Sequence, residues 1–392
     1  MKEERQEDNY QTKRQDARLG NIILMAILII GSAVIGFFTG NSVGYFGDKY
    51  GIPGLLISIG LLILIFLGAS FLHILVHEGG HLVFGLLSGY KFVSFRVGSL
   101  MFIKESGKLK TKKFNIVGTG GQCLMMPDSN WNAYKFPYIL YNLGGSLANV
   151  ILALISLALY MAFPETRFIS ELFIISFIVG IMGALMNAIP MKISGIANDG
   201  YNALHLSKDS QALRALYLQL YINGLQTKGI RLKDIPEEYF EIPEAADLSN
   251  PLIVTIGVFK CNRLHDNKDF IKAKEYSQYL IDKAPGLLDL HKNELLCELL
   301  FYEIIGTCRK DEIERIYTKE LKDYIKNTSA YVSRRRLMYA YEIFVNNDRQ
   351  RAKEELEAFN KIAKNYPYSG DVESEREIIK FIDDLAIIKN IN

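Results

Sequence analysis

The sequence has few cysteines and almost no net charge. Its four cysteines, Cys123, Cys261, Cys297 and Cys308, include no CxxC pair, which favours free thiols in a reducing compartment over a disulfide framework or a cysteine zinc site. A net charge of +2 over 392 residues gives no reason to expect a nucleic-acid partner.

Charged residues are also missing from long stretches of the first half. Apolar runs extend over 21–38, 53–88, 136–163 and 168–190. Runs of about 20 apolar residues are long enough to span a bilayer, so we predict four transmembrane helices. The first run is longer than the apolar part of a signal peptide, and no small-residue cleavage site follows it, which favours a retained helix.

The other segments have their own composition. Residues 90–135 alternate apolar and polar side chains around turn signals, which predicts short β-strands and hairpins. The predicted order is a charged tail (1–19), a first transmembrane helix with a Gly-rich external loop at 39–52 (20–52), a membrane core (53–224) containing the β-loop (90–135), a Pro-containing linker (225–250) and a soluble helical domain (251–392).

Basic residues predict the orientation in a membrane. The β-loop region 89–135 carries eight Lys or Arg residues, whereas 39–52 and 164–167 carry one each. By the positive-inside rule, the tail, the β-loop and everything after Pro190 face the cytoplasm of a multi-pass cell-membrane protein.

The last domain shows heptad-like apolar spacing in six segments, and similar short sequences recur in it at a period of roughly 40 residues. The spacing indicates either helix pairs stacked as in tetratricopeptide-like arrays, which usually offer a groove to a protein partner, or a plain helical bundle. The predicted segments are 251–263, 267–283, 287–304, 310–326, 330–345 and 348–365.

An ionisable pattern, His77-Glu78-Gly79-Gly80-His81, interrupts the second apolar run. On a helix, residues i and i+4 share a face, so His77 and His81 can bind one cation while Glu78 takes a proton from metal-bound water. Two His, a carboxylate and an open position are typical of catalytic zinc. Such groups are costly in lipid, so the cluster predicts a function; the alternative is a polar patch satisfied inside a helical bundle.

Two further histidines lie near this pattern in the sequence. His73 is one turn before His77 on the same face of the helix. It is either a fourth ligand or, as we favour, a residue that contacts the ligands without binding the metal and orients them or a water molecule. His205 follows the last apolar run, and we interpret it as a surface histidine or one behind the ligands.

The H-E-x-x-H pattern in an apolar helix, with two later stretches, resembles the site-2 protease family of intramembrane zinc metalloproteases over about residues 53–205. Asn187-Ala188-Ile189-Pro190, followed by Asp199-Gly200, is similar to the family's N-x-x-P and D-G elements. The resemblance implies that Asp199 is the third zinc ligand and that Asn187 lies at the substrate site. Asn198 replaces the family's Leu, and the interval between Pro190 and Asp199 is about four residues longer than usual. Asp199 is alternatively the cap of a helix that begins at Gly200.

The other stretches concern the substrate. Residues 118–125 are similar to the Gly-Gly strand of the family, which implies that Gly120 and Gly121 present an edge strand to the substrate; a Gly-rich connecting loop is the alternative. The stretch from Gly144 to Asn149 resembles the family's G-P-x-x-x-N motif, with Gly145 in place of Pro. Asn149 then helps to orient the substrate, while the glycines serve that motif or only helix packing.

The resemblance implies a mainly α-helical, polytopic membrane protein that uses Zn²⁺ to cleave membrane-embedded proteins or peptides. In such a protein Glu78 is the general base, and the lipid bilayer surrounds the helices. Two rival hypotheses remain. One is an inactive membrane anchor for the helical domain. The other is a transporter that uses the polar cluster as an ion path, although the inverted repeats expected of many transporters are not found.

Overall fold

The computed structural model describes residues 2–105, 107–115, 119–164, 168–193 and 195–389. Met1 of the predicted tail, Gly118 of the Gly-rich stretch and residues 165–167 lie outside these ranges. The chain divides into two compact units. The first comprises Met1–Val97, Gly120–Asp128 and Lys135–Asp209, and the second Gly98–Thr119, Ser129–Tyr134 and Ser210–Asn392.

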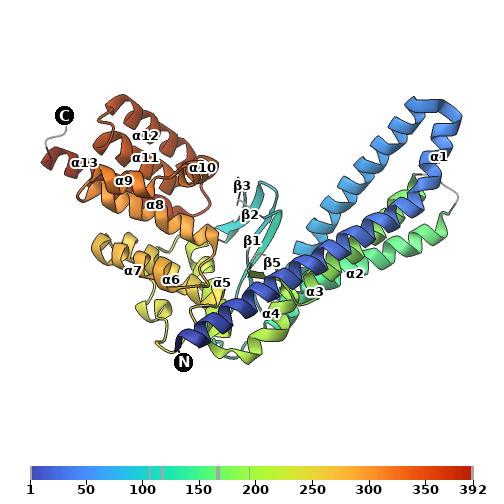
Figure 1. Cartoon of the computed structure of the whole chain (residues 1–392), viewed down its shortest axis with the longest axis horizontal. Coiled ribbons are helices and arrows are strands. Elements are labelled where there is room, and N and C mark those ends of the chain that lie inside the picture. Colours follow the sequence, from blue (N-terminus) through green and yellow to red (C-terminus); the bar gives the residue numbers. More distant parts are fainter. Residues whose placement is uncertain (1, 106, 116–118, 165–167, 194, 390–392) are drawn as a thin grey trace. The chain divides into compact units, whose positions relative to one another are not determined.

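The first unit begins with a helix that doubles back on itself. α1 (Lys2–Leu87) has one residue with non-helical dihedral angles, Gly51, at φ 63° and ψ −153°. Only glycine adopts such a conformation readily, and Figure 1 shows the chain reversing direction there. The sequence predicts a Gly-rich loop over 39–52, but the helix continues to the turn at Gly51 because Phe46 stacks on Tyr50 and packs against Phe168.

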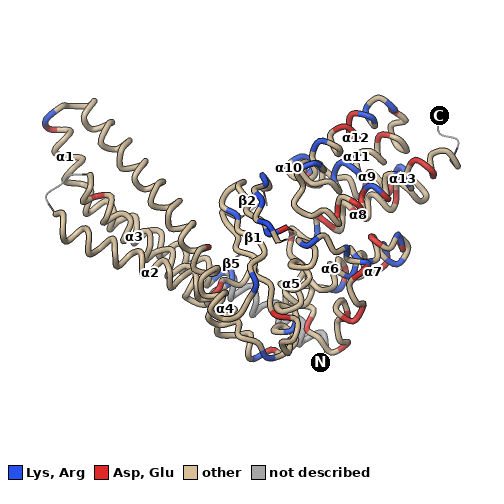
Figure 2. Tube along the Cα trace, turned by 180° about the vertical axis from the view of Figure 1, so that it is seen from behind, with Lys and Arg blue, Asp and Glu red and all other residues tan. Residues whose placement is uncertain are grey.

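Three helices of the described residues are long and apolar enough to cross a membrane: Arg18–Leu87 of α1, α2 (Ile139–Ala162) and α3 (Ile169–Ala188). The two halves of α1 correspond to the first two predicted spans. Figure 2 shows that these helices carry almost no charge. The prediction of a mainly helical protein with long apolar helices is therefore confirmed at this level.

Small residues let the apolar helices approach closely. α1, α2 and α3 pack on one another. A Cβ atom at Gly80 of α1 would overlap the carbonyl oxygen of Gly144 in α2, so the two backbones are in contact at this crossing. Since Gly80 lies within the H-E-x-x-H turn, the crossing sets α2 directly against the histidines.

Short strands complete the first unit. β1 (Lys91–Val97) follows α1 directly and pairs antiparallel with β4 (Gly121–Met126), with Val97 opposite Gly121. After α3, the two-residue strands β5 (Lys192–Ile193) and β6 (Ile196–Ala197) form a small hairpin. The short helix α4 (Asp199–His205) follows it and packs on α2 and α3.

The second unit is helical except for one hairpin, β2 (Leu100–Glu105) with β3 (Lys108–Lys113). Its core contains Phe301, Leu337, Phe359 and Ile378. Met101, Ile103 and Phe114 of the hairpin region pack against Tyr331, Tyr366 and Tyr368. The helices are α5 (Ser210–Thr227), α6 (Pro251–Asp266), α7 (Phe270–Lys283), α8 (Asp289–Ile305), α9 (Lys310–Ile316), α10 (Lys319–Asn327), α11 (Val332–Phe344), α12 (Arg349–Ala363) and α13 (Ser369–Ile388).

The boundary between the units differs from the expected one at residue 224. It lies at Asp209, because α5 buries side chains on several faces, including Leu213, Leu216 and Leu218, and packs against α6. The predicted linker 225–250 contains the end of α5 and two short 3-10 helices, and Ile235 and Phe240 within it are buried. The predicted segment 310–326 is two helices because Thr318 caps α10.

A partly buried carboxyl group in the second unit makes the stability depend on pH. Burial, and then the nearby Glu375, raise the pKa of Asp371 to about 7, and Gln226 donates a hydrogen bond to Asp371 over 3.4 Å. An acid whose folded pKa lies above its unfolded value destabilises the fold increasingly as pH rises from about 4 to about 7.

Asp371→Asn is therefore expected to stabilise the protein more at pH 8 than at pH 5. We expect about 1–3 kcal/mol at pH 8, since one pKa unit corresponds to about 1.4 kcal/mol and the partial exposure of the side chain reduces the effect. Thermal unfolding of the full chain at both pH values measures it. Asp384→Asn, at an exposed site on the same helix, controls for the lost charge. Equal shifts at both pH values would contradict the prediction.

Candidate metal centre

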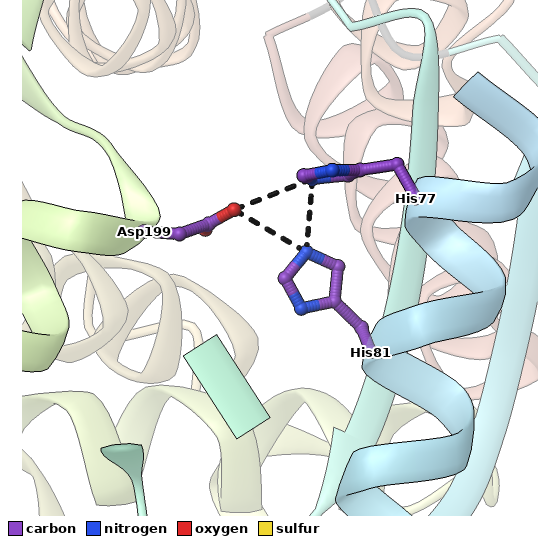
Figure 3. A group of neighbouring side chains, drawn as sticks. All are labelled: His77, His81 and Asp199. Atoms are coloured by element: carbon purple, nitrogen blue, oxygen red, sulfur yellow. Dashed lines mark hydrogen bonds and ion pairs between the residues drawn. The ribbon is translucent and has the colours of Figure 1, made fainter. Parts of the chain in front are cut away.

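Three side chains from two elements converge in the first unit. His77 and His81 project from the last turns of α1, and Asp199 is the first residue of α4 (Figure 3). The Nε2 atoms of His77 and His81 are 3.1 Å apart. Oδ2 of Asp199 lies 3.3 Å from Nε2 of His77 and 3.4 Å from Nε2 of His81. Together they form a group that could hold a metal ion.

The three donor atoms fit one tetrahedral ion. Zinc bonds of about 2.0–2.1 Å at tetrahedral angles place neighbouring donor atoms about 3.3 Å apart. The observed separations of 3.1, 3.3 and 3.4 Å match this spacing. Burial by itself would raise the pKa of Asp199, but the hydrogen bonds from His77 and His81 hold that pKa at about 2. The carboxylate is therefore ionised, as a ligand must be.

Asn198 places Asp199 at this site. Its side-chain oxygen accepts hydrogen bonds from the backbone N–H groups of Met191 (3.1 Å) and Tyr201 (2.9 Å), and its amide nitrogen donates to the carbonyls of Met186 (2.8 Å) and Ile189 (2.6 Å). These four bonds close the loop formed by the β5–β6 hairpin and cap α4.

The segment between Pro190 and Asp199 contains this hairpin, and the hydrogen bonds of Asn198 tie it to the end of α3. The helix cap is Asn198 rather than Asp199, so the carboxylate of Asp199 is free to face the histidines. A Cβ atom at Gly200 would overlap the carbonyl oxygen of Ala188, so α4 begins in contact with the end of α3.

Tyr141 of α2 holds two parts of the site. Its carbonyl oxygen accepts a hydrogen bond from Nδ1 of His81 over 2.8 Å, which leaves Nε2 to face His77 and Asp199. Its hydroxyl donates to the carbonyl of Cys123 in β4 over 3.1 Å. A backbone carbonyl is a common partner for the second nitrogen of a metal-binding histidine. Sequence reasoning missed Tyr141, since a backbone acceptor leaves no signal in the residue type.

Glu78 lies beside the ligands, against the strand predicted to meet the substrate. A Cβ atom at Gly121 of β4 would lie 2.7 Å from Cγ and 2.8 Å from Oε1 of Glu78. The absence of a side chain at Gly121 is therefore what admits the carboxyl group. Gly120 is exposed near Ile74, one turn before Glu78 on α1, so the Gly-Gly stretch passes over the metal-binding stripe.

The other predicted residues have defined places. Asn149 is buried, and its Nδ2 lies 3.5 Å from Nδ1 of His77. Asn187, in the last turn of α3, donates to the carbonyl of Gly183 over 2.9 Å. His73 contacts Asn149 rather than the metal group. His205 stacks on Tyr201 within α4. The substrate roles of Asn149 and Asn187 stay predictions.

No family model, curated protein or solved structure matches the chain. The chemistry of the site therefore has to be inferred from its own residues.

Gly145→Ala is expected to displace the His77 ring and weaken metal binding. The new methyl group would lie 2.6 Å from both ring nitrogens of His77, inside van der Waals contact, so the ring must leave its position. We expect at least about a tenfold weaker zinc affinity, measured by chelator competition on the purified protein. The control is Gly68→Ala, because a Cβ atom at Gly68 of α1 meets nothing within 4 Å. Equal affinities in the two variants would contradict this reading.

Proposed function

We propose that this protein is a zinc-dependent intramembrane endopeptidase that cleaves membrane-embedded proteins or peptides. The observation that carries the proposal is the triangle of His77, His81 and Asp199 donor atoms, 3.1–3.4 Å on a side, with Glu78 beside it. His77, Glu78 and His81 lie on α1, which is long and apolar enough to cross a membrane, and Asp199 begins the short helix α4. Ionisable residues in such helices are costly and usually functional.

His77, His81 and Asp199 would hold the ion. Bound zinc supplies a Lewis acid and lowers the pKa of a bound water toward 7. Glu78 takes a proton from the attacking water as its oxygen bonds to the scissile carbonyl carbon. When the C–N bond breaks, Glu78 gives that proton to the departing amine. Gly121 has no side chain and so leaves room for the carboxyl group of Glu78 at the site.

β4 is suited to hold the substrate backbone. A transmembrane helix hides its carbonyls in hydrogen bonds, so it must unwind locally before cleavage. β4 pairs on one side with β1, and no other described strand pairs with its second edge. A substrate segment can add there as a further strand, with its backbone drawn past Gly120 and Glu78.

The remaining parts of the proposal concern location and partners. With the tail, the β-strands and the second unit on the cytoplasmic side, the metal group lies near the cytoplasmic end of its helices. The helical second unit then meets the cytoplasm, where it is placed to recruit or sense a protein partner.

The proposal is tested by comparing membrane-embedded peptides in cells with and without this protein. We expect defined transmembrane fragments to accumulate in the cells without it. The purified protein should cleave a synthetic peptide that covers such a fragment, lose this activity with a zinc chelator and regain it with added zinc. If the two peptide profiles are the same, and the protein still binds zinc, the inactive-anchor hypothesis is favoured.

A further inference from the structure

A row of buried polar side chains runs from the metal group between the apolar helices. His73 of α1, Asn149 and Ser156 of α2, and Ser176 of α3 are each 3–6% exposed. Burying a polar group without a partner costs free energy, and here each group has one. Nδ1 of His73 is 3.1 Å from Oδ1 of Asn149, Nε2 of His73 is 3.2 Å from Oγ of Ser176, and Oγ of Ser176 is 2.9 Å from Oγ of Ser156.

The row ends at His77, on the ring nitrogen that does not face the other predicted metal ligands. Nδ2 of Asn149 lies 3.5 Å from Nδ1 of His77, while Nε2 of His77 faces His81 and Asp199. A histidine that binds metal through one ring nitrogen carries its proton on the other and needs an acceptor for it. His81 has a backbone carbonyl for this purpose, whereas the group that Nδ1 of His77 meets among the described residues is the side-chain amide of Asn149.

An amide can present either its oxygen or its NH₂ group, so something must fix its orientation. In the structure the Asn149 oxygen faces His73 and the nitrogen faces His77. Turning the amide by 180° exchanges the two and gives His77 its acceptor. His73 then accepts from the Asn149 NH₂ group through Nδ1 and donates through Nε2 to Ser176, which donates to Ser156. Every polar group in the row keeps a partner in this arrangement.

The neighbouring helices leave room for this row. A Cβ atom at Gly180 of α3 would overlap the His73 ring, and one at Gly183 would lie 3.1 Å from Nδ2 of Asn149. Gly145 makes the same room for His77. Glycine therefore occurs in α2 and α3 where the row requires space.

We propose that His73 is a positioning residue: backed by Ser176 and Ser156, it orients the Asn149 amide so that His77 presents Nε2 to the metal. The inference rests on the proposed metal site but not on the reaction. Both ring nitrogens of His73 are engaged in the row, so His73 is not a fourth ligand. The metal affinity of the site should then depend on a histidine that never touches the ion.

The test measures metal binding by the purified full-length protein. We expect His73→Leu to weaken zinc affinity by about 10–100-fold in chelator competition and to alter the visible spectrum of the Co²⁺-loaded protein. His73→Gln, which can still bond to Asn149 and Ser176, should restore part of the affinity. Asn149→Leu should weaken binding as much as His73→Leu, and the double variant no more than either. The matched control is His205→Leu, because the hydrogen bond and the ring stacking of His205 in the described part of the chain are both with Tyr201.

Unchanged zinc affinity in folded His73→Leu protein would overturn the proposal, as would additive losses in the double variant. If His73→Leu does not fold, Ser176→Ala decides, because it removes the hydroxyl that bonds to Nε2 of His73 and leaves His73 and Asn149 in place. A wild-type affinity in Ser176→Ala together with no loss in His73→Gln would then count against the proposal. Failure of the proposed function is distinct: the chain would bind zinc in this manner and cleave nothing.

Discussion

Glu78→Gln is expected to reduce peptide cleavage by about a hundredfold to ten-thousandfold, the usual contribution of a general base. Glutamine keeps the shape of the side chain beside Gly121 but cannot accept the proton of the attacking water. Glu78 is not one of the three converging ligands, so we expect the variant to retain zinc. Loss of activity without loss of metal would distinguish the role of Glu78 as a base from the role of the metal ligands.

The measurement uses purified protein in lipid vesicles, with a transmembrane peptide from the fragment comparison as substrate and zinc content determined in parallel. Glu171→Gln is a matched control. Glu171 is a buried acid of the long apolar helices, and it contacts Ser42 and the backbone N–H of Phe168 at the opposite end of α3 from α4. Normal cleavage by Glu78→Gln would refute the assigned base, and zinc loss would make Glu78 a ligand.

Asp199→Ala is expected to remove most of the bound metal. The substitution takes away one of three donor atoms and leaves two imidazoles. We expect at least about a hundredfold weaker zinc affinity, more than the 10–100-fold typical of residues behind a ligand. Because Asn198 rather than Asp199 caps α4, the fold of the loop should persist.

The experiment is chelator competition on the purified variant, with circular dichroism to confirm the helix content. Asp234→Ala, at an exposed site of the second unit, is the control for a lost carboxylate. Asn198→Ala should also weaken zinc binding, because its four hydrogen bonds hold Asp199 in place. Wild-type affinity in Asp199→Ala would exclude this carboxylate as a ligand.

Local spacing predicted part of the site. The separation of four residues between His77 and His81 puts both rings on one helix face whatever surrounds the helix. Asp199 was predicted as a ligand from its place after an apolar helix and from the family resemblance. Its approach to the histidines, however, depends on the β5–β6 hairpin. Asn198 was noticed only as a departure from the family pattern, and its four hydrogen bonds could not be read from the residue type.

The sequence by itself determined the long apolar helices, the short strands over 91–126, the helices after 251 and the two-histidine face. Each follows from the periodicity with which a helix or a strand directs its side chains. Only the tertiary structure decided that Asp199 completes a triangle with the histidines, that Asn149 lies behind His77, and that Tyr141 links His81 to β4. These contacts depend on how closely helices cross, which glycines such as Gly80 and Gly145 set by leaving space. A glycine adds nothing to the apolar periodicity of a sequence. The close contacts that it permits are therefore seen only in the packed structure.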